Sequence, residues 1–565
     1  MQISIRKKCL VLVITFLLFF ISSASLSVGV TNNQIHVTNQ LKTIYVDDDN
    51  IAGPWNGSIN YPYQTIQSGI NAASNGDTVY TFNGTYNQKL TINKEINLIG
   101  ENKDITIING GGSGRVIVIN ADFVTISGFT IQNGGYWDPG IDISVSNYIT
   151  ISNNIIENTG GISLFNSIHN TIEENTLSNN NFGVSMVSSS NNEICDNIIL
   201  NNEYGAYIFF ASNNNILFMN VIAENNYGIY LYGSLNNTIN ENNIEDNTLS
   251  GIEFFGSSYI NRISNTTISN NLDGIYIEGG SENTIFKCDI HSNKGNAIVI
   301  YDSERNSITN CDIHDNTFYG VLLTKASSNT IKESNITKNL ETGLLIWNTS
   351  KNNTIKDNLV SYNKEGISFK KKNPSDNSDN NNIFHNSFLF NEDFNAYDQN
   401  SNIWDIGYPF GGNCWSDYAG GDQYRGPNQD IPGGDGIGDI PYEILGGDNI
   451  DRYPILCLGP PPPIVNITRP LKNTLYFANR SGVSFPSTVI IGKLEIQVKA
   501  YNNYTEMDKV EFFIDEVLVF TDYEEPYTWM WDDKTLFDFK HTIKVIGYDD
   551  LENTAEEEIE VLELL

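Results

Sequence analysis

The stretch GIYLYGSLNNTINENNIEDNTLS, residues 228–250, decides the fold of this chain. It opens with a glycine and an alternating apolar run, and it holds three short apolar segments separated by Gly, Asn and Ser. Alternation with a period of two, bounded by such residues, is typical of β-strands joined by tight corners. A related stretch begins at Gly251, 23 residues after Gly228, so this segment is one unit of a repeat.

The same pattern governs the middle of the chain in two registers. Alternating apolar residues follow Gly140, Gly161, Gly183, Gly205, Gly228, Gly251, Gly274, Ala297, Gly320, Gly343 and Gly366. An asparagine stands two residues before isoleucine at Asn170, Asn192, Asn214, Asn237, Asn261, Asn283, Asn306, Asn329 and Asn353. One such unit cannot bury a core alone, whereas stacked units bury a continuous apolar column. The sequence therefore predicts an all-β chain built on a right-handed parallel β-helix with about 23 residues per coil.

Composition divides the rest of the chain into segments. Residues 44–110 predict an N-terminal cap and the first coils, with a helix from about Tyr63 to Ser74, and residues 111–403 predict the β-helix repeats. An Asp- and Gly-rich closing segment follows at 404–459, and prolines at 460–463 predict a stiff linker. Residues 464–565 alternate as in an antiparallel immunoglobulin-like β-sandwich.

The N-terminus predicts export. Basic residues at 6–8 precede an apolar run from Leu10 to Ile21 and then small residues, which is typical of a signal peptide over residues 1–25, followed by a leader at 26–43. The run is short for a membrane-spanning helix. We expect an extracellular or cell-surface protein that is not inserted in the membrane after signal removal.

The charge balance excludes one class of partner. The chain carries 67 acidic and 32 basic residues, a formal net charge of -35. A surface of this sign repels phosphate backbones, so nucleic acid and anionic lipid are not expected partners.

Three motifs carry a family resemblance: IYVDDD at Ile44, NGTY at Asn83 and INLIGEN at Ile96, followed by the Asn-x-Ile coils. Together they resemble NosD-like copper-binding β-helix surface proteins of archaeal type, and the coils are similar to carbohydrate-binding and sugar-hydrolase β-helix domains. The resemblance spans residues 44–456. It implies the fold, and it implies a metal-handling accessory protein as one functional alternative. KVEFFIDEVLV, which begins at Lys509, resembles the immunoglobulin-like modules of secreted surface proteins.

Strand alternation predicts which aromatic residues point outward. One outward column holds Tyr207, Tyr230, Glu253 and Tyr276; the next holds Phe209, Tyr232, Phe255, Glu278, Tyr301 and Trp347. A flat ledge of stacked rings is suited to packing against sugar rings, so we predict a polysaccharide or cell-envelope component as the partner. The alternative is that aromatic residues favour exposed strand positions and stack only on each other.

Two carboxylates on this surface raise an enzymatic alternative. Glu253 and Glu278 fall on neighbouring coils about 8 Å apart, within the range of an inverting carboxylate pair, which points to a polysaccharide hydrolase or lyase. The clustered Asp and Gly-His-Gly pattern of polygalacturonases is missing from the sequence. A pectate lyase would need a basic residue beside a carboxylate-bound calcium, and the aromatic columns are short of Arg and Lys. We therefore expect a non-enzymatic protein.

Two metal sites are predicted by residue type. Asp430, Asp435 and Asp439 stand among glycines, so they are candidates for calcium, although a Gly-Asp turn cluster gives the same pattern. The repeated CDIH puts Asp289, His291, Asp312 and His314 on one outward face, where these residue types suit zinc or copper.

The cysteines give two candidate disulfides. Cys288 and Cys311 face inward on successive coils, where they either pack as thiols or form a disulfide. Cys414 and Cys457 bracket the closing segment and are the second candidate pair.

Overall fold

The computed structural model describes residues 41–371, 373, 376–457, 463–477, 479–480, 482–502, 507–532, 540–550 and 553–564. The expected signal peptide, most of the leader and most of the proline linker lie outside these ranges. Among the described helical segments, none has the length and apolar character needed to cross a membrane.

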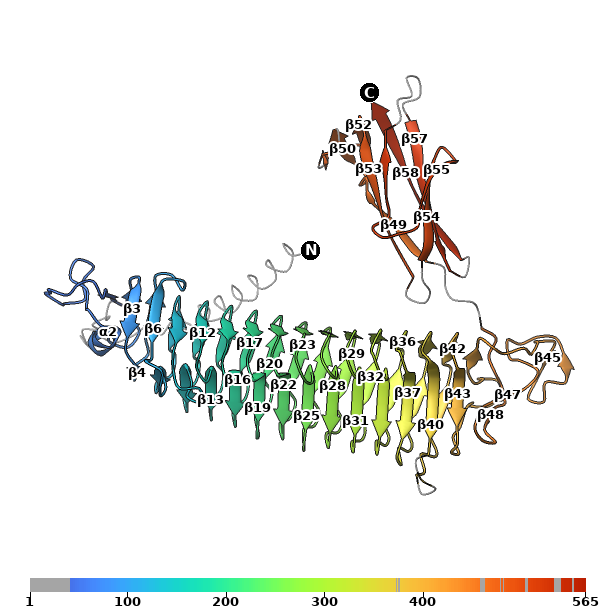
Figure 1. Cartoon of the computed structure of the whole chain (residues 1–565), viewed down its shortest axis with the longest axis horizontal. Coiled ribbons are helices and arrows are strands. Elements are labelled where there is room, and N and C mark those ends of the chain that lie inside the picture. Colours follow the sequence, from blue (N-terminus) through green and yellow to red (C-terminus); the bar gives the residue numbers. More distant parts are fainter. Residues whose placement is uncertain are drawn as a thin grey trace, which may run out of the picture. The chain divides into compact units, whose positions relative to one another are not determined.

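A parallel β-helix forms the first part of the described chain, as predicted (Figure 1). Each coil gives one strand to each of three parallel sheets. Sheet 1 consists of β1 (Thr43–Val46), β2 (Thr78–Thr81), β5 (Asn97–Gly100), β8 (Thr125–Ser127), β11 (Thr150–Ser152), β14 (Thr171–Glu173), β17 (Glu193–Cys195), β20 (Ile216–Phe218), β23 (Thr238–Asn240), β26 (Arg262–Ser264), β29 (Thr284–Phe286), β32 (Ser307–Thr309), β35 (Thr330–Lys332), β38 (Thr354–Lys356) and β41 (Asn382–Phe384).

Sheet 2 contains the alternating runs that follow the repeat glycines. It consists of β4 (Leu90–Ile92), β7 (Ile117–Ile119), β10 (Ile141–Ser144), β13 (Ile162–Phe165), β16 (Phe182–Val187), β19 (Tyr204–Phe209), β22 (Tyr227–Tyr232), β25 (Ile252–Phe255), β28 (Ile275–Glu278), β31 (Ile298–Tyr301), β34 (Val321–Thr324), β37 (Thr342–Trp347), β40 (Glu365–Lys370) and β43 (Phe394–Asp398).

Sheet 3 completes each coil. It consists of β3 (Gly84–Asn87), β6 (Thr106–Asn109), β9 (Thr130–Gln132), β12 (Ile155–Glu157), β15 (Thr176–Ser178), β18 (Ile198–Leu200), β21 (Val221–Ala223), β24 (Asn243–Glu245), β27 (Thr267–Ser269), β30 (Asp289–His291), β33 (Asp312–His314), β36 (Asn335–Thr337), β39 (Leu359–Ser361), β42 (Ser387–Leu389) and β44 (Cys414–Trp415). The inward side chains of all three sheets form one core; Ile229, Leu231, Ile239 and Ile244 of a single coil are fully buried in it.

Asparagine ladders stabilise the corners between the sheets. Asn215 donates its side-chain N–H to the Asn237 carboxamide oxygen (3.1 Å) and accepts from Asn192 (3.0 Å), so the amides bond from coil to coil. Each satisfied amide removes the cost of a buried polar group. One asparagine of the Asn-x-Ile register does not belong to the ladder: Asn214 is exposed, and Asn215 takes the ladder position because Leu217, and not Ile216, points into the core.

A short helix covers the N-terminal end of the core. Helix α2 (Ile66–Ala72) begins after Thr65, whose side-chain oxygen accepts from the Ser68 backbone N–H, and it buries Ile66 and Ile70. The predicted helix is therefore present. The helix is shorter than the predicted 63–74, because Thr65 caps it at one end and Ala73 adopts an extended conformation at the other.

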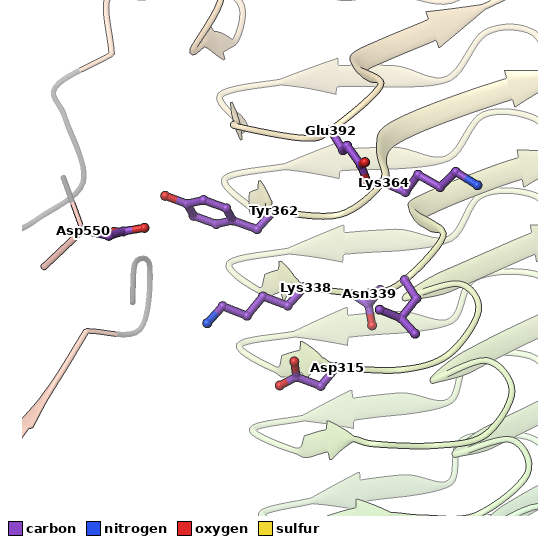
Figure 2. A pocket seen from close by; sticks show the side chains of 8 residues that line it. Asp315, Lys338, Asn339, Tyr362, Lys364, Glu392 and Asp550 are labelled. Atoms are coloured by element: carbon purple, nitrogen blue, oxygen red, sulfur yellow. The ribbon is translucent and has the colours of Figure 1, made fainter. Parts of the chain in front are cut away.

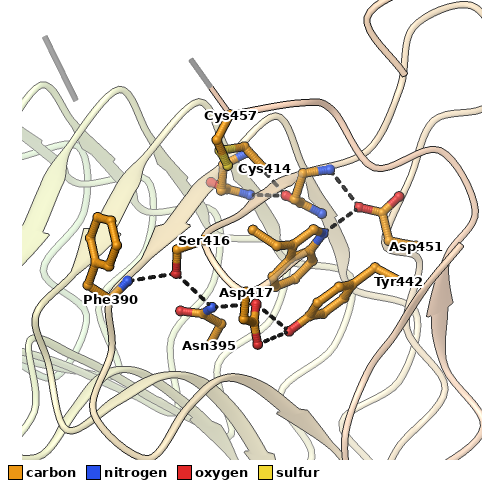
Figure 3. Close-up of a disulfide and its surroundings, with 11 residues drawn as sticks. Phe390, Asn395, Cys414, Ser416, Asp417, Tyr442, Asp451 and Cys457 are labelled. Atoms are coloured by element: carbon orange, nitrogen blue, oxygen red, sulfur yellow. Dashed lines mark hydrogen bonds between the residues drawn. A yellow bond between two sulfur atoms is a disulfide. The ribbon is translucent and has the colours of Figure 1, made fainter. Parts of the chain in front are cut away.

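The closing segment packs on the C-terminal end of the core through Ile444 and Tyr442. Figure 3 shows its disulfide and the side chains around it. Its short strands are β45 (Tyr424–Arg425), β46 (Ile431–Pro432), β47 (Tyr442–Glu443) and β48 (Ile450–Asp451). The Trp415 ring stacks between Phe388 (centroids 4.8 Å apart) and Tyr442 (4.2 Å), and its indole N–H donates to buried Asp451 (3.0 Å). Cys414 and Cys457 form the predicted disulfide, with Cα atoms 5.1 Å apart.

A separate β-sandwich follows the linker. Its three-stranded sheet consists of β49 (Ile464–Arg469), β53 (Leu494–Tyr501) and β56 (Thr528–Trp531). Its other sheet consists of β51 (Val483–Ser484), β50 (Thr474–Phe477), β52 (Val489–Ile491), β58 (Thr554–Leu564), β57 (Lys540–Asp549), β54 (Met507–Ile514) and β55 (Val517–Asp522). Ile496, Phe512, Trp531 and Val545 are buried in a core of its own, so this part is a domain.

Candidate functional site

Aromatic side chains gather on the outward face of sheet 2, in strands β16, β19, β22 and β25. The first predicted column is confirmed by the strand register, in which Tyr207 pairs with Tyr230, Tyr230 with Glu253, and Glu253 with Tyr276. The side chains of all four residues are half-buried. The alternation of the strand therefore aims them outward while the neighbouring coils cover their flanks.

The second predicted column lies two residues further along each strand. Phe209 pairs with Tyr232, Tyr232 with Phe255, Phe255 with Glu278, and Glu278 with Tyr301. Trp347 follows in the same column beyond Thr324. The two columns run side by side along sheet 2.

A third column was missed by the sequence reasoning. Phe182 pairs with Tyr204, and Tyr204 pairs with Tyr227, on the other side of the first column. Each of these residues stands immediately before a repeat glycine, so the pattern aromatic-Gly was a usable signal. We use the term aromatic face for the rings of the three columns, namely Phe182, Tyr204, Tyr207, Phe209, Tyr227, Tyr230, Tyr232, Phe255, Tyr276, Tyr301 and Trp347.

The rings stack along the columns. Tyr204 and Tyr227 are 5.0 Å apart at 5°, Tyr207 and Tyr230 are 5.6 Å apart at 11°, and Phe209 and Tyr232 are 5.0 Å apart at 25°. Each ring therefore covers the face of the next, and the interior of a column presents ring edges and hydroxyl groups to solvent. The flat ledge of exposed ring faces that the sequence suggested is not formed inside the columns.

The first and third ring columns are interrupted at the coil of strand β25, where polar residues take their places, whereas the second continues to Phe255, which stacks on Tyr232 and is followed by Glu278. Glu253 follows Tyr230, and in the same register Ser250 follows Tyr227. The Ser250 hydroxyl donates to the Glu253 carboxylate (3.1 Å). Tyr227 and Tyr230 therefore each have one ring face that no further ring covers, and only these smaller or polar groups lie beside it. We call Ser250, Glu253 and Glu278, together with Tyr227, Tyr230 and Tyr276 beside them, the acidic step.

Burial and neighbouring charges shift the pKa values of side chains in the acidic step. Burial, and then the charges of Glu278 and Asp273, raise the pKa of Glu253, although the Ser250 hydroxyl opposes the shift. Burial and the Glu253 carboxylate raise the pKa of Tyr230. The Tyr276 hydroxyl donates to Glu278 (3.1 Å). A carboxyl group with a raised pKa beside tyrosine hydroxyl groups is a candidate for proton transfer.

The register supports the predicted relation between the two glutamates. Glu253 pairs with Tyr276, and Glu278 lies two residues further along the same strand. They therefore lie on adjacent strands of sheet 2 with a two-residue offset.

The histidine patch lies on sheet 3, away from the aromatic face. Asp289 pairs with Asp312 and His291 with His314 in the register of β30 and β33, and all four side chains reach solvent, as predicted. The two imidazole rings stack with centroids 5.0 Å apart. His314 contacts Asp289 through Nε2 (3.2 Å) and Asp315 through Nδ1 (2.6 Å).

Both nitrogens of His314 are thus engaged by carboxylates. The hydrogen bonds with Asp289 and Asp315 raise the pKa of His314 to about 9. An imidazolium has no lone pair for a metal ion. Figure 2 shows the same corner continuing from Asp315 to Lys338 and Tyr362 on the next coils. Within the described ranges, no three His, Cys, Asp or Glu side chains come close enough together to hold a metal ion.

Comparisons with known proteins bear on the family. The model of the family described as periplasmic copper-binding protein (NosD) matches residues 68–258, 207–321 and 247–420, which together cover more than half of the chain. The chain belongs to the NosD family. A bacterial Ig domain model matches residues 463–545, in agreement with the predicted sandwich. No curated protein shows a significant match to the sequence.

Solved structures that resemble this NosD-family chain are distant. The Azotobacter vinelandii mannuronan C-5 epimerase AlgE6 A-module shares 16% identity over 60% of this chain and 92% of its own, with a TM-score of 0.33. The catalytic domain of a GH87 alpha-1,3-glucanase in complex with tetrasaccharides shares 15% sequence identity over 62% of this chain and 68% of its own, with a TM-score of 0.35. Clostridium thermocellum CbhA fibronectin(III)-like modules share 20% sequence identity over 20% of this chain, with a TM-score of 0.15, and this chain covers 55% of their length.

The calcium candidates of this NosD-family chain are not brought together. The Asp439 carboxylate accepts the backbone N–H groups of Gln423 (2.8 Å) and Tyr424 (3.0 Å), and Asp435 accepts that of Ile437 (3.2 Å). Asp430 is exposed. The carboxylates serve as turn acceptors, which was the alternative interpretation. Asp422, which the sequence reasoning missed, accepts from Asp435 and Gly436 in the same turns.

Cys288 and Cys311 face inward as predicted, each 2% exposed, and they are free thiols, so of the two alternatives they pack as thiols and form no disulfide. They occupy the ladder position between sheets 1 and 3 that asparagines such as Asn242 take in other coils. The Cys311 thiol donates to the backbone carbonyl of Thr309 (3.4 Å). Each thiol thus fills a ladder position as a small, mostly apolar group.

Proposed function

We propose that this NosD-family protein is exported to the cell surface and binds a polysaccharide, or another glycan-bearing envelope component, along the aromatic face without cleaving it. The observation that carries the proposal is the alignment of three ring columns over β16, β19 and β22 of one exposed sheet. Rings and tyrosine hydroxyl groups supply apolar area and hydrogen bonds at low entropic cost. A linear surface of this kind suits an extended ligand.

The proposed binding geometry follows from the stacking. Ring faces inside a column are covered, so a sugar contacts ring edges and hydroxyl groups there. It contacts a ring face where a column ends, beside Tyr227 and Tyr230 at the acidic step. The rings also stabilise the coils, since each aromatic pair contributes about 1 kcal/mol. Binding and stability must therefore be measured separately.

The experiment is a glycan array probed with the full chain. Tyr230→Ala/Tyr232→Ala removes the ring that precedes Glu253 in the first column and the ring beside it in the second column. The control is Phe123→Asn/Tyr148→Asn, which removes another exposed ring stack (4.9 Å, 3°) outside the aromatic face; both positions have positive φ, which asparagine tolerates. We expect array binding to be lost only in the tyrosine variant. Unchanged binding in that variant, with an unchanged unfolding midpoint, would contradict the proposal.

A polysaccharide hydrolase or lyase is the second candidate, and the raised pKa of Glu253 beside Glu278 favours it. A carboxyl group of raised pKa is suited to protonate a glycosidic oxygen. The assay measures reducing ends and unsaturated products from bound polysaccharides, with the native chain and with Glu253→Gln. Product release by the native chain alone would establish the enzyme and overturn the non-enzymatic proposal.

Metal handling is the third candidate, and the description of the NosD family supports it. The histidine patch gives it less support, because His314 is protonated below about pH 9 and its nitrogens are engaged. Calorimetric titration with Cu²⁺ and Zn²⁺ before and after His291→Ala/His314→Ala tests the patch. Calcium binding by Asp430, Asp435 and Asp439 stays a prediction, which a shift of the unfolding midpoint with Ca²⁺ against a chelator would establish.

A further inference from the structure

We infer that the polysaccharide bound by the aromatic face carries protonated amino groups. The inference rests on the proposed function and names the class of its ligand. It starts from the charges of the face and its corner beside strands β16 to β28, where the chain carries Glu203, Glu253, Asp273 and Glu278 and no Lys or Arg. Uronic acid chains would be repelled by these charges, and ammonium groups would be attracted.

The acidic step offers an ammonium group two kinds of contact at once. Glu253 follows Tyr230 and precedes Tyr276 in the first column, so a carboxylate lies between two tyrosine rings on adjacent coils. A cation placed over a tyrosine ring gains cation–π attraction in addition to the ion pair with the carboxylate. A neutral sugar hydroxyl gains neither.

The molecule shows such a contact with one of its own ammonium groups. Lys325 Nζ lies 5.1 Å from the centroid of the Tyr301 ring and 3.1 Å from its hydroxyl oxygen. Tyr301 is the ring that follows Glu278 in the second column. The aromatic face therefore already holds one cation, at a ring whose column neighbour is a carboxylate.

The two glutamates also match a repeating ligand. Strands of neighbouring coils are about 4.8 Å apart, and the two-residue offset adds about 6.6 Å along the strand. Glu253 and Glu278 thus present two charges about 8 Å apart on a diagonal of the face. A polymer with an amino group on each sugar can place two ammonium groups on the pair, whereas a single ammonium ion reaches only one glutamate.

The test uses calorimetric titration of the full chain at several pH values from mildly acidic to neutral, because protonated amino groups need the lower pH and an ionised Glu253 needs the higher. The ligands are a glucosamine oligosaccharide, the same oligosaccharide fully N-acetylated, and an alginate oligosaccharide of equal length. We expect the amino form to bind about tenfold tighter than the acetylated form, the size of one modest ion pair. We expect alginate to bind least. Added salt should weaken the amino form and leave the acetylated form unchanged.

Variants distinguish the contribution of the two carboxylate charges to binding from the contribution of the aromatic rings. Glu253→Gln/Glu278→Gln should lower the affinity for the amino form about tenfold, to that of the acetylated form. Glu174→Gln/Glu241→Gln removes the same charge from exposed corner residues between sheets 1 and 3 and should change nothing. Tyr230→Ala/Tyr232→Ala should lower the affinity for both sugars. Unfolding midpoints check that every variant is folded.

Each contrary result has a distinct meaning. Equal binding of amino and acetylated forms, unaffected by Glu253→Gln/Glu278→Gln but abolished by Tyr230→Ala/Tyr232→Ala, overturns the inference and leaves the proposed function intact. Preferred binding of alginate, or an equal loss in the Glu174→Gln/Glu241→Gln control, also overturns it. Binding of no sugar overturns both.

Discussion

Glu253 stands directly beside Tyr230 in the register of β25 and β22, so the stacked rings end on a carboxylate. Burial then raises the pKa of Glu253, because charge is costly away from water. This contact places a titratable carboxyl group in the proposed binding surface. The stability of the chain should therefore depend on pH.

Glu253→Gln should become more stable relative to the native chain as the pH rises. The folded-state pKa of Glu253 lies above its unfolded value of about 4.3, so the native chain loses stability as the pH rises from there through the folded-state pKa. Glutamine has no such loss. Denaturant unfolding at several pH values measures the difference between the two chains, and a difference that stays constant with pH would contradict the shift.

His314→Gln should also gain stability relative to the native chain as the pH rises, but over a higher pH range and from a less stable starting point. Ion pairs with Asp289 and Asp315 raise the pKa of His314 to about 9, above the unfolded value of about 6.5. The stabilisation is complete below about pH 6.5 and is lost as the pH rises through about 9. The variant should be up to about 1 kcal/mol less stable at low pH and equal to the native chain at high pH. Histidine NMR titration measures the pKa itself.

Asn215→Ala should destabilise the β-helix strongly, by about 3 kcal/mol, because the backbone N–H and side chain of Asn192 lose their acceptor and the Ser189 carbonyl loses a donor. The neighbouring Asn214 is exposed with φ 58°. Asn214→Gly keeps that conformation and should change stability by no more than about 0.5 kcal/mol. Unfolding followed by circular dichroism compares the pair. Equal effects would mean that the ladder contributes nothing.

Removing the Cys414–Cys457 disulfide should loosen the closing segment. The bond joins residues 43 apart, and closing a loop of that size stabilises the fold by about 4 kcal/mol in the chain-entropy model. Cys457→Ser should therefore lower the unfolding midpoint and speed hydrogen exchange around Trp415 and Asp451. A reductant should reproduce the effect in the native chain and add nothing in the variant.

Thiol counting tests both the cysteine assignments and the expected signal peptide. The folded chain should not react with a thiol reagent, because Cys195, Cys288 and Cys311 are buried. The unfolded, unreduced mature chain should expose three thiols. A fourth would report Cys9, and hence a chain that retains residues 1–25.

The period of the sequence was sufficient to predict the coils, the outward columns and the inward cysteines, because burial of one face forces strict alternation. The period assigned the repeated asparagine position to Asn214, although Asn215 occupies it. Both asparagines stand two residues before an aliphatic residue, so the spacing could not distinguish them. It missed Phe182, Tyr204 and Tyr227, which precede the glycines from which the alternation was counted. It could not predict that the rings cover one another, because ring orientation depends on side-chain torsions that no periodicity encodes.

The acceptors of the closing segment could not be predicted for a related reason. Asp435 and Asp439 have the residue type of calcium ligands, yet their oxygens accept backbone N–H groups from turns that have no repeat. Residue type restricts the possible partners, and the path of an irregular chain selects among them. Closing segments are therefore where sequence patterns give least information.

The ladder also determines how this protein can change its length. Asn353 and Asn381 are bonded neighbours although 28 residues separate them, whereas the step from Asn306 to Asn329 takes 23. That coil is longer in sequence between β40, which ends at Lys370, and β41, which begins at Asn382. Genetic insertions at a corner are thus absorbed without disturbing the stack, and gain or loss of a whole coil moves the acidic step relative to the closing segment. Evolution, or an engineer, can lengthen the molecule and leave its core unchanged.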